Sequence, residues 1–447
     1  MNEEPIISVS GLRGVIGATL TPDVAARYVC AFARQVSPGP LVITRDGRAT
    51  GRMIADAVRS SLSAVGRDVI DADVAATPTT GVLVQELKAA GAIQISASHN
   101  PPEYNGLKLF SGEGRVISAA AGQPVLDRFR AGSSPEWVGH DRLGEISTLK
   151  DSLSEHCRRV LKTVAVDRIR SCKFKVLLDS NHGAGSLLGL KLLEELGCEV
   201  VALGAKPDGL FAHTPEPTAA NLSGVSQQVR EAGVQLGFCQ DPDADRLALI
   251  DDTGHYVGEE FTLAVVIRHV LEQAKGPIVT NCSTSRMSQD LAEQAGVPFY
   301  RSKVGEANVT ELMIQHQAVF GGEGNGGPID PRVGFVRDSF VGMALVLDAM
   351  AAREATLSEL IAELPQYAIH KTKVPVAADQ LTTTFDRLAS GFFDAKADRL
   401  DGLRLDWPTA WLLVRASNTE PIVRLVAEAP SADEAERLCQ RAAELMD

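Results

Sequence analysis

Short apolar runs rich in β-branched residues alternate with helical patterns along most of the chain. Three of these runs, at residues 41–44, 175–178 and 277–280, each end in a small polar or glycine-bearing loop and continue into an apolar helical pattern. Alternation of strands and helices is typical of α/β domains, in which functional loops lie at the carboxyl ends of the strands. The pattern therefore predicts three related α/β units.

The last part of the chain has a different pattern. Apolar runs at 411–415 and 422–427 are followed by a closing helix from about residue 432, which indicates a smaller α+β domain. Candidate seams lie in a stretch of helical periodicity at 149–166, after a strand in 247–253, and in the lead-in at 367–373. The 447 residues suffice for several domains. We predict four, with boundaries at 1–148, 149–252, 253–368 and 369–447.

Composition narrows the class of protein. Hydrophobic residues make up 45% and charged residues 23%, as in ordinary globular proteins. The net charge of −13 argues against nonspecific nucleic-acid binding, which needs a basic surface. A small anionic substrate remains compatible, because local arginines, lysines and helix N-termini can oppose the overall charge.

Cysteine usage and the apolar runs bear on the compartment. The seven cysteines are scattered without a CxxC pair, which indicates reduced thiols and disfavours a zinc site. The acidic start of the chain does not resemble a signal peptide, and no run approaches the roughly 18 apolar residues of a membrane span. We expect a cytoplasmic enzyme with no membrane partner. The oligomeric state stays open.

A first candidate loop, residues 96–108, follows the apolar run at 92–95 and reads SASHNPPEYNGLK. Its two prolines disfavour a helix, so we expect Ser98 and His99 to be exposed. A phosphorylated Ser98 would carry nearly two negative charges and three acceptor oxygens. His99 can polarise or orient a group, and Lys108 can act as acid or base. The alternative is an ordinary polar turn.

A second candidate loop holds three aspartates at alternating positions, in Asp241-Pro-Asp-Ala-Asp-Arg246. In an extended turn such side chains share one face, and carboxylate oxygens suit a hard cation such as Mg²⁺. Apolar runs at 236–239 and 247–250 flank the loop. A solvated acidic turn is the alternative, but three charges between two buried strands repel one another in a way that a cation relieves.

Two further loops complete the set. The glycine-dense stretch 321–327 allows close approach of a ligand, and its Glu323 and Asn325 can bond sugar hydroxyls. A loop at a strand end has the inventory of a phosphate cradle, namely Arg415, Ser417, Asn418 and Thr419. Arg13 lies in a glycine-flanked loop that could face a phosphate. Flexible turns and plain surface charges are the alternatives, also for Arg45, Arg48 and Arg246.

These four loops, in this order and over essentially the whole chain, resemble the α-D-phosphohexomutase superfamily. The resemblance implies three related α/β domains and a C-terminal α+β phosphate-binding domain around a central cleft. It implies a phosphorylated Ser98, which with the three aspartates Asp241, Asp243 and Asp245 would bind Mg²⁺. It also implies sugar contacts from Glu323 and Asn325, a distal phosphate site at 415–419, and Lys108 and Arg246 near the transferred phosphoryl group.

The resemblance further implies a function. The expected reaction interconverts hexose 1-phosphate and hexose 6-phosphate, with glucosamine, glucose or mannose as the sugar and a hexose 1,6-bisphosphate as intermediate and activator. Lys108 is the expected general base, with His99 second. The sequence departs from many relatives at three positions: Pro242 in place of Gly, Asn325 in place of Ser, and Gly327 in place of a substrate-contacting His.

Three other functions remain to be weighed. A sugar-phosphate phosphatase is the main alternative, in which water takes the phosphoryl group. A serine hydrolase is disfavoured because Ser98 does not lie in a GxSxG sequence. A noncatalytic sugar-phosphate sensor is disfavoured because all the main chemical groups are present.

Overall fold

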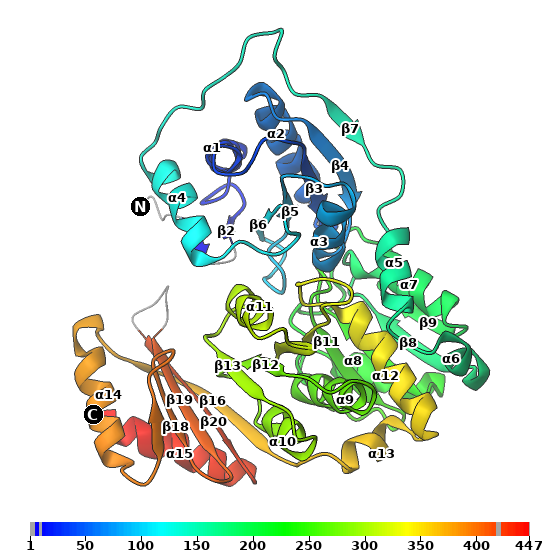
Figure 1. The fold of residues 1–447 in the computed structure, drawn as a ribbon, viewed down its shortest axis with the longest axis vertical. Coiled ribbons are helices and arrows are strands. Elements are labelled where there is room, and N and C mark those ends of the chain that lie inside the picture. Colours follow the sequence, from blue (N-terminus) through cyan, green and yellow to red (C-terminus); the bar gives the residue numbers. More distant parts are fainter. Residues whose placement is uncertain (1–4, 9–10, 417–421, 447) are drawn as a thin grey trace.

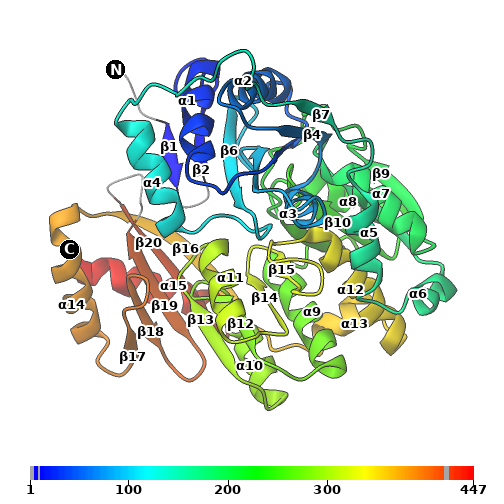
Figure 2. The same ribbon diagram turned by 45° about the horizontal axis from the view of Figure 1, so that its top comes forward.

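Four separate β-sheets organise the computed structural model, which describes residues 5–8, 11–416 and 422–446. Figures 1 and 2 show them following one another in chain order, from blue at the N-terminal side through green and yellow to red. The predicted α/β units and the α+β C-terminal domain are confirmed. The exact domain boundaries stay a prediction.

The first three sheets share one strand pattern. A first strand pairs in parallel with a second and a third, and the third pairs antiparallel with a fourth. In the first sheet these are β3 (Leu41–Arg45), β4 (Val69–Val74), β5 (Gly91–Ile95) and β6 (Tyr104–Ser111). In the second they are β8 (Lys175–Asp179), β9 (Glu199–Leu203), β10 (Leu236–Gln240) and β11 (Leu247–Asp251). In the third they are β12 (Ile278–Asn281), β13 (Phe299–Ser302), β14 (Phe320–Glu323) and β15 (Gly327–Ile329).

Helices and extra strands complete these domains. The first sheet gains β1 (Ile6–Ser8), β2 (Gly11–Val15) and β7 (Ile146–Thr148), with helices α1 (Pro22–Ala33), α2 (Gly51–Ala64), α3 (Thr77–Glu86) and α4 (Ala119–Arg130). The second domain has α5 (Ser154–Leu161), α6 (Val166–Cys172), α7 (Gly185–Glu195) and α8 (Ser223–Ala232). The third has α9 (Glu259–Gln273), α10 (Met287–Gln294), α11 (Glu306–Gln315), α12 (Ser339–Arg353) and α13 (Leu357–Ala362). The helical stretch predicted at 149–166 thus resolves into α5 and the beginning of α6.

Helix α12 joins the second and third domains. Nearly all of its residues are buried, and it packs against α9 and α6, so one hydrophobic core runs through both domains. A helix that is apolar all round has to be covered on every side, which fixes the two domains against each other. Asp338 caps this helix by accepting from the backbone N–H groups of Phe340 and Val341.

The C-terminal domain is an antiparallel sheet in the order β16 (Ala368–Pro375), β20 (Ile422–Ala429), β19 (Trp411–Ala416), β18 (Leu403–Asp406) and β17 (Lys396–Asp398). The residues predicted as a lead-in at 367–373 form most of the edge strand β16. One terminal helix was predicted, and α15 (Ala432–Met446) is that helix. The prediction missed α14 (Leu381–Gly391) and the 3₁₀ turn Ala378–Gln380 before it. No helix in the described part of the chain is long and apolar enough to cross a lipid bilayer.

Candidate active site

Three functional loops occupy the same place in the repeated strand pattern, between the third strand and the antiparallel fourth. We call them the serine loop (residues 96–103), the aspartate loop (241–246) and the glycine loop (324–326, together with Glu323 at the end of β14). A cavity of about 890 Å³ lies beside the aspartate and glycine loops, and all four domains line it, through residues that include Arg13, Lys108, Arg246, Asn325 and Arg415. The predicted central cleft is therefore present.

Ser98 lies against the aspartate loop. Its Oγ donates to Asp241 Oδ2 at 2.8 Å, and His99 Nδ1 lies 3.4 Å from the same Oγ. The expected exposure of Ser98 is wrong, because the aspartate loop packs over it and leaves it 2% exposed. Ser98 also has a φ of 51°, a left-handed backbone conformation that is costly for a residue other than glycine.

Arg48 holds the serine loop in place. Its guanidinium donates to the carbonyl oxygens of Ser98, Asn100, Pro101 and Tyr104 at 2.6 to 3.1 Å. Asp46 pairs with the same side chain at 3.0 Å. Arg48 is therefore a buried structural cation and not the surface charge that the sequence left possible.

The three aspartates form one buried group. Asp241, Asp243 and Asp245 are fully buried, and one carboxylate oxygen from each lies within 4.8 Å of the others. Asp243 Oδ1 and Asp245 Oδ1 are buried without a hydrogen-bond partner among the described residues. Since buried acceptors are normally satisfied and carboxylate oxygens are the ligands of hard cations, this donor set fits a divalent metal ion.

Lys108 bridges two of these carboxylates. Its Nζ lies 3.1 Å from Asp243 Oδ2 and 3.0 Å from Asp245 Oδ2. Burial disfavours the charged amine, but the two carboxylates outweigh burial and raise the pKa of Lys108 above its usual value. At Asp243 burial is likewise outweighed, by Lys108 together with the hydrogen bond from Thr77, and the pKa is lowered. Burial and the neighbouring aspartates raise the pKa of Asp241.

The surroundings of His99 favour its uncharged form, whereas those of Lys108 favour the charged form. Burial, followed by the nearby cations Arg246 and Arg13, lowers the pKa of His99 to about 2. The imidazole is therefore neutral over the whole physiological range. Arg13 Nη1 donates to Asn100 Oδ1 at 3.0 Å, which places this predicted phosphate contact beside the serine loop.

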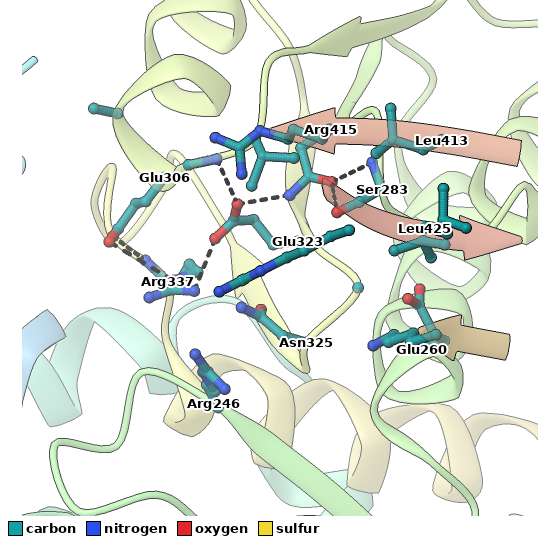
Figure 3. A pocket seen from close by; sticks show the side chains of 18 of the residues that line it. Arg246, Glu260, Ser283, Glu306, Glu323, Asn325, Arg337, Leu413, Arg415 and Leu425 are labelled. Carbon is teal, nitrogen blue, oxygen red and sulfur yellow. Dashed lines mark hydrogen bonds and ion pairs between the residues drawn. The ribbon is translucent and has the colours of Figure 1, made fainter. Parts of the chain in front are cut away.

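The glycine loop carries its two predicted sugar contacts in different ways (Figure 3). Glu323 is held by Asn281 Nδ2 and Gly305 N on one oxygen and by Arg337 Nη1 on the other, at 2.6, 3.0 and 2.7 Å. Asn325 lines the cavity, and its Oδ1 is buried without a partner among the described residues. Asn325 is thus the freer of the two groups for a ligand.

The phosphate cradle is described only in part. Arg415 lies on β19, lines the cavity and pairs with Asp401 at 2.9 Å. The predicted contacts Ser417, Asn418 and Thr419 lie outside the described residues.

Sequence reasoning missed Arg337, which lies between the aspartate and glycine loops. Arg337 Nη2 donates to Asp245 Oδ2 at 2.6 Å, and Arg337 Nη1 donates to Glu323 Oε2 at 2.7 Å. The next residue, Asp338, has a sequence signal, because an aspartate before an apolar run is typical of a helix cap. No local pattern points from Arg337 to partners so distant along the chain.

Comparison with known proteins gives one consistent result. The four domain models of the phosphoglucomutase/phosphomannomutase family, domains I to III and the C-terminal domain, match residues 6–136, 154–254, 259–367 and 372–445. A phosphoglucomutase/phosphomannomutase of Thermococcus kodakarensis is 36% identical over 98% of this chain and 97% of its own. A probable phosphoglucosamine mutase of Methanopyrus kandleri is 33% identical over 96% and 95%.

A solved structure gives the same answer for the fold. A phosphoglucomutase/phosphomannomutase family protein of Burkholderia thailandensis superposes with a TM-score of 0.86 at 26% identity, covering 100% of this chain and 98% of the other. The predicted resemblance is confirmed. This chain belongs to the phosphoglucomutase/phosphomannomutase family of the α-D-phosphohexomutases.

Proposed function

We propose that this chain interconverts hexose 1-phosphate and hexose 6-phosphate through a phosphorylated Ser98 and a hexose 1,6-bisphosphate. The observation that carries the proposal is the position of Ser98 Oγ, 2.8 Å from Asp241 Oδ2 beside the buried aspartate group. A hydroxyl at this place adjoins both the candidate metal ligands and the cations of the cavity, so a phosphoryl group there would be neutralised from two sides.

The reaction is a double transfer. The bond between phosphorus and Ser98 Oγ breaks while a new bond forms between phosphorus and the free hydroxyl oxygen of the sugar monophosphate. The resulting bisphosphate turns round in the cavity, whose volume of about 890 Å³ leaves room for a hexose with two phosphates. Its other phosphoryl group then returns to Ser98, which regenerates the phosphorylated enzyme.

Mg²⁺ is the proposed metal, bound by Asp241, Asp243, Asp245 and a phosphate oxygen on Ser98. When bound, the ion neutralises charge on the transferring phosphoryl group. Among the described residues, the unpartnered oxygens of Asp243 and Asp245 support this assignment.

Lys108 and Arg246 supply positive charge beside the transfer. Lys108 Nζ is held between Asp243 and Asp245, so we assign it electrostatic stabilisation in preference to the predicted role of general base. Phosphoryl transfer through a loose transition state depends mainly on positioning and charge. A weak acceptor therefore suffices for the hydroxyl proton, and neutral His99, 3.4 Å from Ser98 Oγ, is our candidate outside the aspartate group.

The remaining groups hold the substrate. Arg415, together with Ser417, Asn418 and Thr419, is proposed to bind the phosphate that is not reacting, and Arg13 to contribute charge on the opposite wall. Glu323 and Asn325 are proposed to bond sugar hydroxyls. The sugar is glucosamine, glucose or mannose, and the names of the two relatives above cover all three sugars.

The test is a coupled mutase assay with Mg²⁺ and a trace of hexose 1,6-bisphosphate as primer. Glucose 1-phosphate, mannose 1-phosphate and glucosamine 1-phosphate are offered in parallel to the wild type, Ser98→Ala and Ser60→Ala, which carries the same change on an exposed face of α2. We expect 6-phosphate from at least one sugar in the wild type and in Ser60→Ala, and none in Ser98→Ala. Release of free phosphate at the rate of substrate loss would establish the phosphatase instead, and no reaction with any sugar would refute the mutase.

A further inference from the structure

A single buried arginine connects the aspartate loop with the glycine loop. Arg337 donates through Nη2 to Asp245 and through Nη1 to Glu323, at 2.6 and 2.7 Å (Figure 3 labels Arg337, Glu323 and Glu306). A guanidinium is planar and rigid, so two bonds from its two ends fix the carboxylates relative to each other. Among the described residues that line the cavity, Arg337 is the one that bonds both a carboxylate of the aspartate loop and the carboxylate of Glu323.

Arg337 is itself held firmly. Its backbone N–H donates to Glu306 Oε1 at 2.8 Å, and its Nε lies 3.6 Å from Glu306 Oε2. The next residue, Asp338, caps α12 and donates its own backbone N–H to Pro328 O at 2.8 Å. Arg337 therefore directly precedes the cap of a helix that is buried along nearly its whole length, and a shift of one carboxylate is passed to the other instead of being absorbed by a mobile side chain.

Gly327 leaves the space that the Arg337 side chain occupies between the two loops. A Cβ added at Gly327 would lie 2.4 Å from Arg337 Cδ, 2.9 Å from Cγ and 3.0 Å from Cβ. These contacts are with the stem of the side chain and not with its flexible end, so a side chain at residue 327 and the observed position of Arg337 exclude each other. The observed position of the Arg337 side chain thus requires a glycine at residue 327.

We propose that Arg337 is a positioning residue that couples metal binding at the aspartate loop to sugar-phosphate binding at the glycine loop. The proposal rests on the proposed function, which makes Asp245 a metal ligand and Glu323 a sugar contact. A metal ion that draws on Asp245 changes the charge that Arg337 balances there, and Glu323 shares the same cation. By linkage, each ligand then changes the affinity of the other by the same factor.

The experiment measures that factor by calorimetry on the unphosphorylated full chain, which binds without turnover. The Mg²⁺ dissociation constant is determined with and without saturating glucose 1-phosphate, and the glucose 1-phosphate constant with and without Mg²⁺; glucosamine 1-phosphate serves as a second probe. In the wild type we expect the two factors to agree, at about tenfold. In Arg337→Met both ligands should still bind, and the factor should fall towards one.

Matched variants separate this coupling from loss of structure. Gly327→Ala should behave like Arg337→Met because it displaces the arginine stem, whereas Gly334→Ala, whose added Cβ has nothing within 4 Å, should behave like the wild type. Arg337→Lys should give an intermediate coupling factor, since an ammonium keeps the positive charge but has no planar group that could donate to both carboxylates at once. Asn281→Ala removes the bond to Glu323 Oε1 and the acceptor for the turn at 283–284, but it leaves both carboxylate bonds of Arg337 in place. It should weaken sugar-phosphate binding and leave the factor unchanged.

Either of two results would overturn the inference: no coupling in the wild type, or the same factor in the wild type, Arg337→Lys and Gly327→Ala. If Arg337→Met does not fold, as judged by thermal unfolding, Arg337→Lys and Gly327→Ala decide the matter. The mutase assay tests the proposed function independently of this coupling. A wild type that converts no hexose phosphate refutes the proposed function, whereas a mutase whose coupling survives these variants refutes only the role of Arg337.

Discussion

His156 Nε2 donates to Asp338 Oδ2 at 2.7 Å, at a point where three domains meet. Because an ionised carboxylate can only accept, this bond fixes where the ring proton lies, and Nδ1 faces Thr79 Oγ1 at 2.9 Å. Thr79 belongs to α3 of the first domain, His156 to α5 of the second, and Asp338 is the cap of α12 in the third. One fully buried imidazole thus joins three domains directly beside Arg337.

Replacing this ring should destabilise the protein through its hydrogen bonds and not its packing. His156→Phe keeps the edge contact with Phe340, whose ring centroid lies 5.4 Å away, but leaves Thr79 and one oxygen of Asp338 unpaired. Burying unpaired polar groups costs about 1–3 kcal/mol. We expect the thermal unfolding midpoint to fall by roughly 2–4 °C for each kcal/mol lost, as for a cooperative unit of about 200 residues. His140→Phe, at an exposed position, should change it little, and equal midpoints for the two variants would contradict the assignment.

Metal affinity should depend on the inner oxygens of the aspartate loop. Asp243→Asn replaces one carboxylate, whose Oδ1 has no hydrogen-bond partner among the described residues, by an amide of similar size. Since hard cations prefer charged oxygen ligands, we expect Mg²⁺ affinity to fall at least tenfold in calorimetry. Asp252→Asn, an exposed residue just after β11, makes the same change in net charge. A similar loss of affinity in both variants would place the metal elsewhere.

Local sequence information sufficed for the aspartate group and for most of the fold. Alternating aspartates between two apolar strands indicate a shared face, and repeated apolar runs followed by polar loops predict the three α/β units, whose sheets are mixed. Helix α14 was missed because its beginning is rich in threonine, a weak helix former that competes through its own side chain.

The parts that could not be predicted depend on contacts between distant segments. The burial of Ser98 comes from a loop 143 residues away, and Arg337 lies 92 residues from Asp245. Arg48 likewise bonds carbonyl oxygens of the serine loop about 50 residues later in the chain. Backbone carbonyls carry no sequence signal, so an arginine that organises a loop through them looks like any other arginine.

Glu260 should make stability depend on pH. Burial raises its pKa to about 8 from an ordinary 4.5, although Ser285 N donates to Oε2 at 2.9 Å. The folded state therefore holds a proton that the unfolded state has lost between about pH 4.5 and 8. The contribution to stability is complete below pH 4.5 and is lost as pH rises through 8.

The effect is measurable by unfolding experiments across that window. At roughly 1.4 kcal/mol per pKa unit the full shift would be worth on the order of 4–5 kcal/mol, and we expect about half, because the carboxyl group also lines the cavity. Glu260→Gln mimics the protonated form and should flatten the decline between pH 5 and 8. Glu103→Gln, at an exposed position, should follow the wild type. A decline as steep in Glu260→Gln as in the wild type would assign the pH dependence to other groups.

Attachment of the C-terminal domain should depend on one indole nitrogen. Trp411 on β19 is fully buried against Cys282 of the third domain, and its Nε1 donates to Glu428 Oε1 at 2.7 Å. The same oxygen accepts from the backbone N–H of Arg286 in the third domain at 2.9 Å, so the tryptophan helps to aim a carboxylate that crosses the interface.

Trp411→Phe keeps most of the apolar contact and removes that donor. Glu428 Oε2 already has no partner among the described residues, so the loss leaves a buried carboxylate poorly satisfied, at a cost of about 1–3 kcal/mol. Because Arg415 lies on the same strand, loosening should raise KM for the sugar phosphate several-fold and affect kcat less. Trp137→Phe, which is 56% exposed in the wild type, should leave both constants unchanged. If KM stays at the wild-type value while the unfolding midpoint falls, the indole stabilises the domain without setting the position of Arg415.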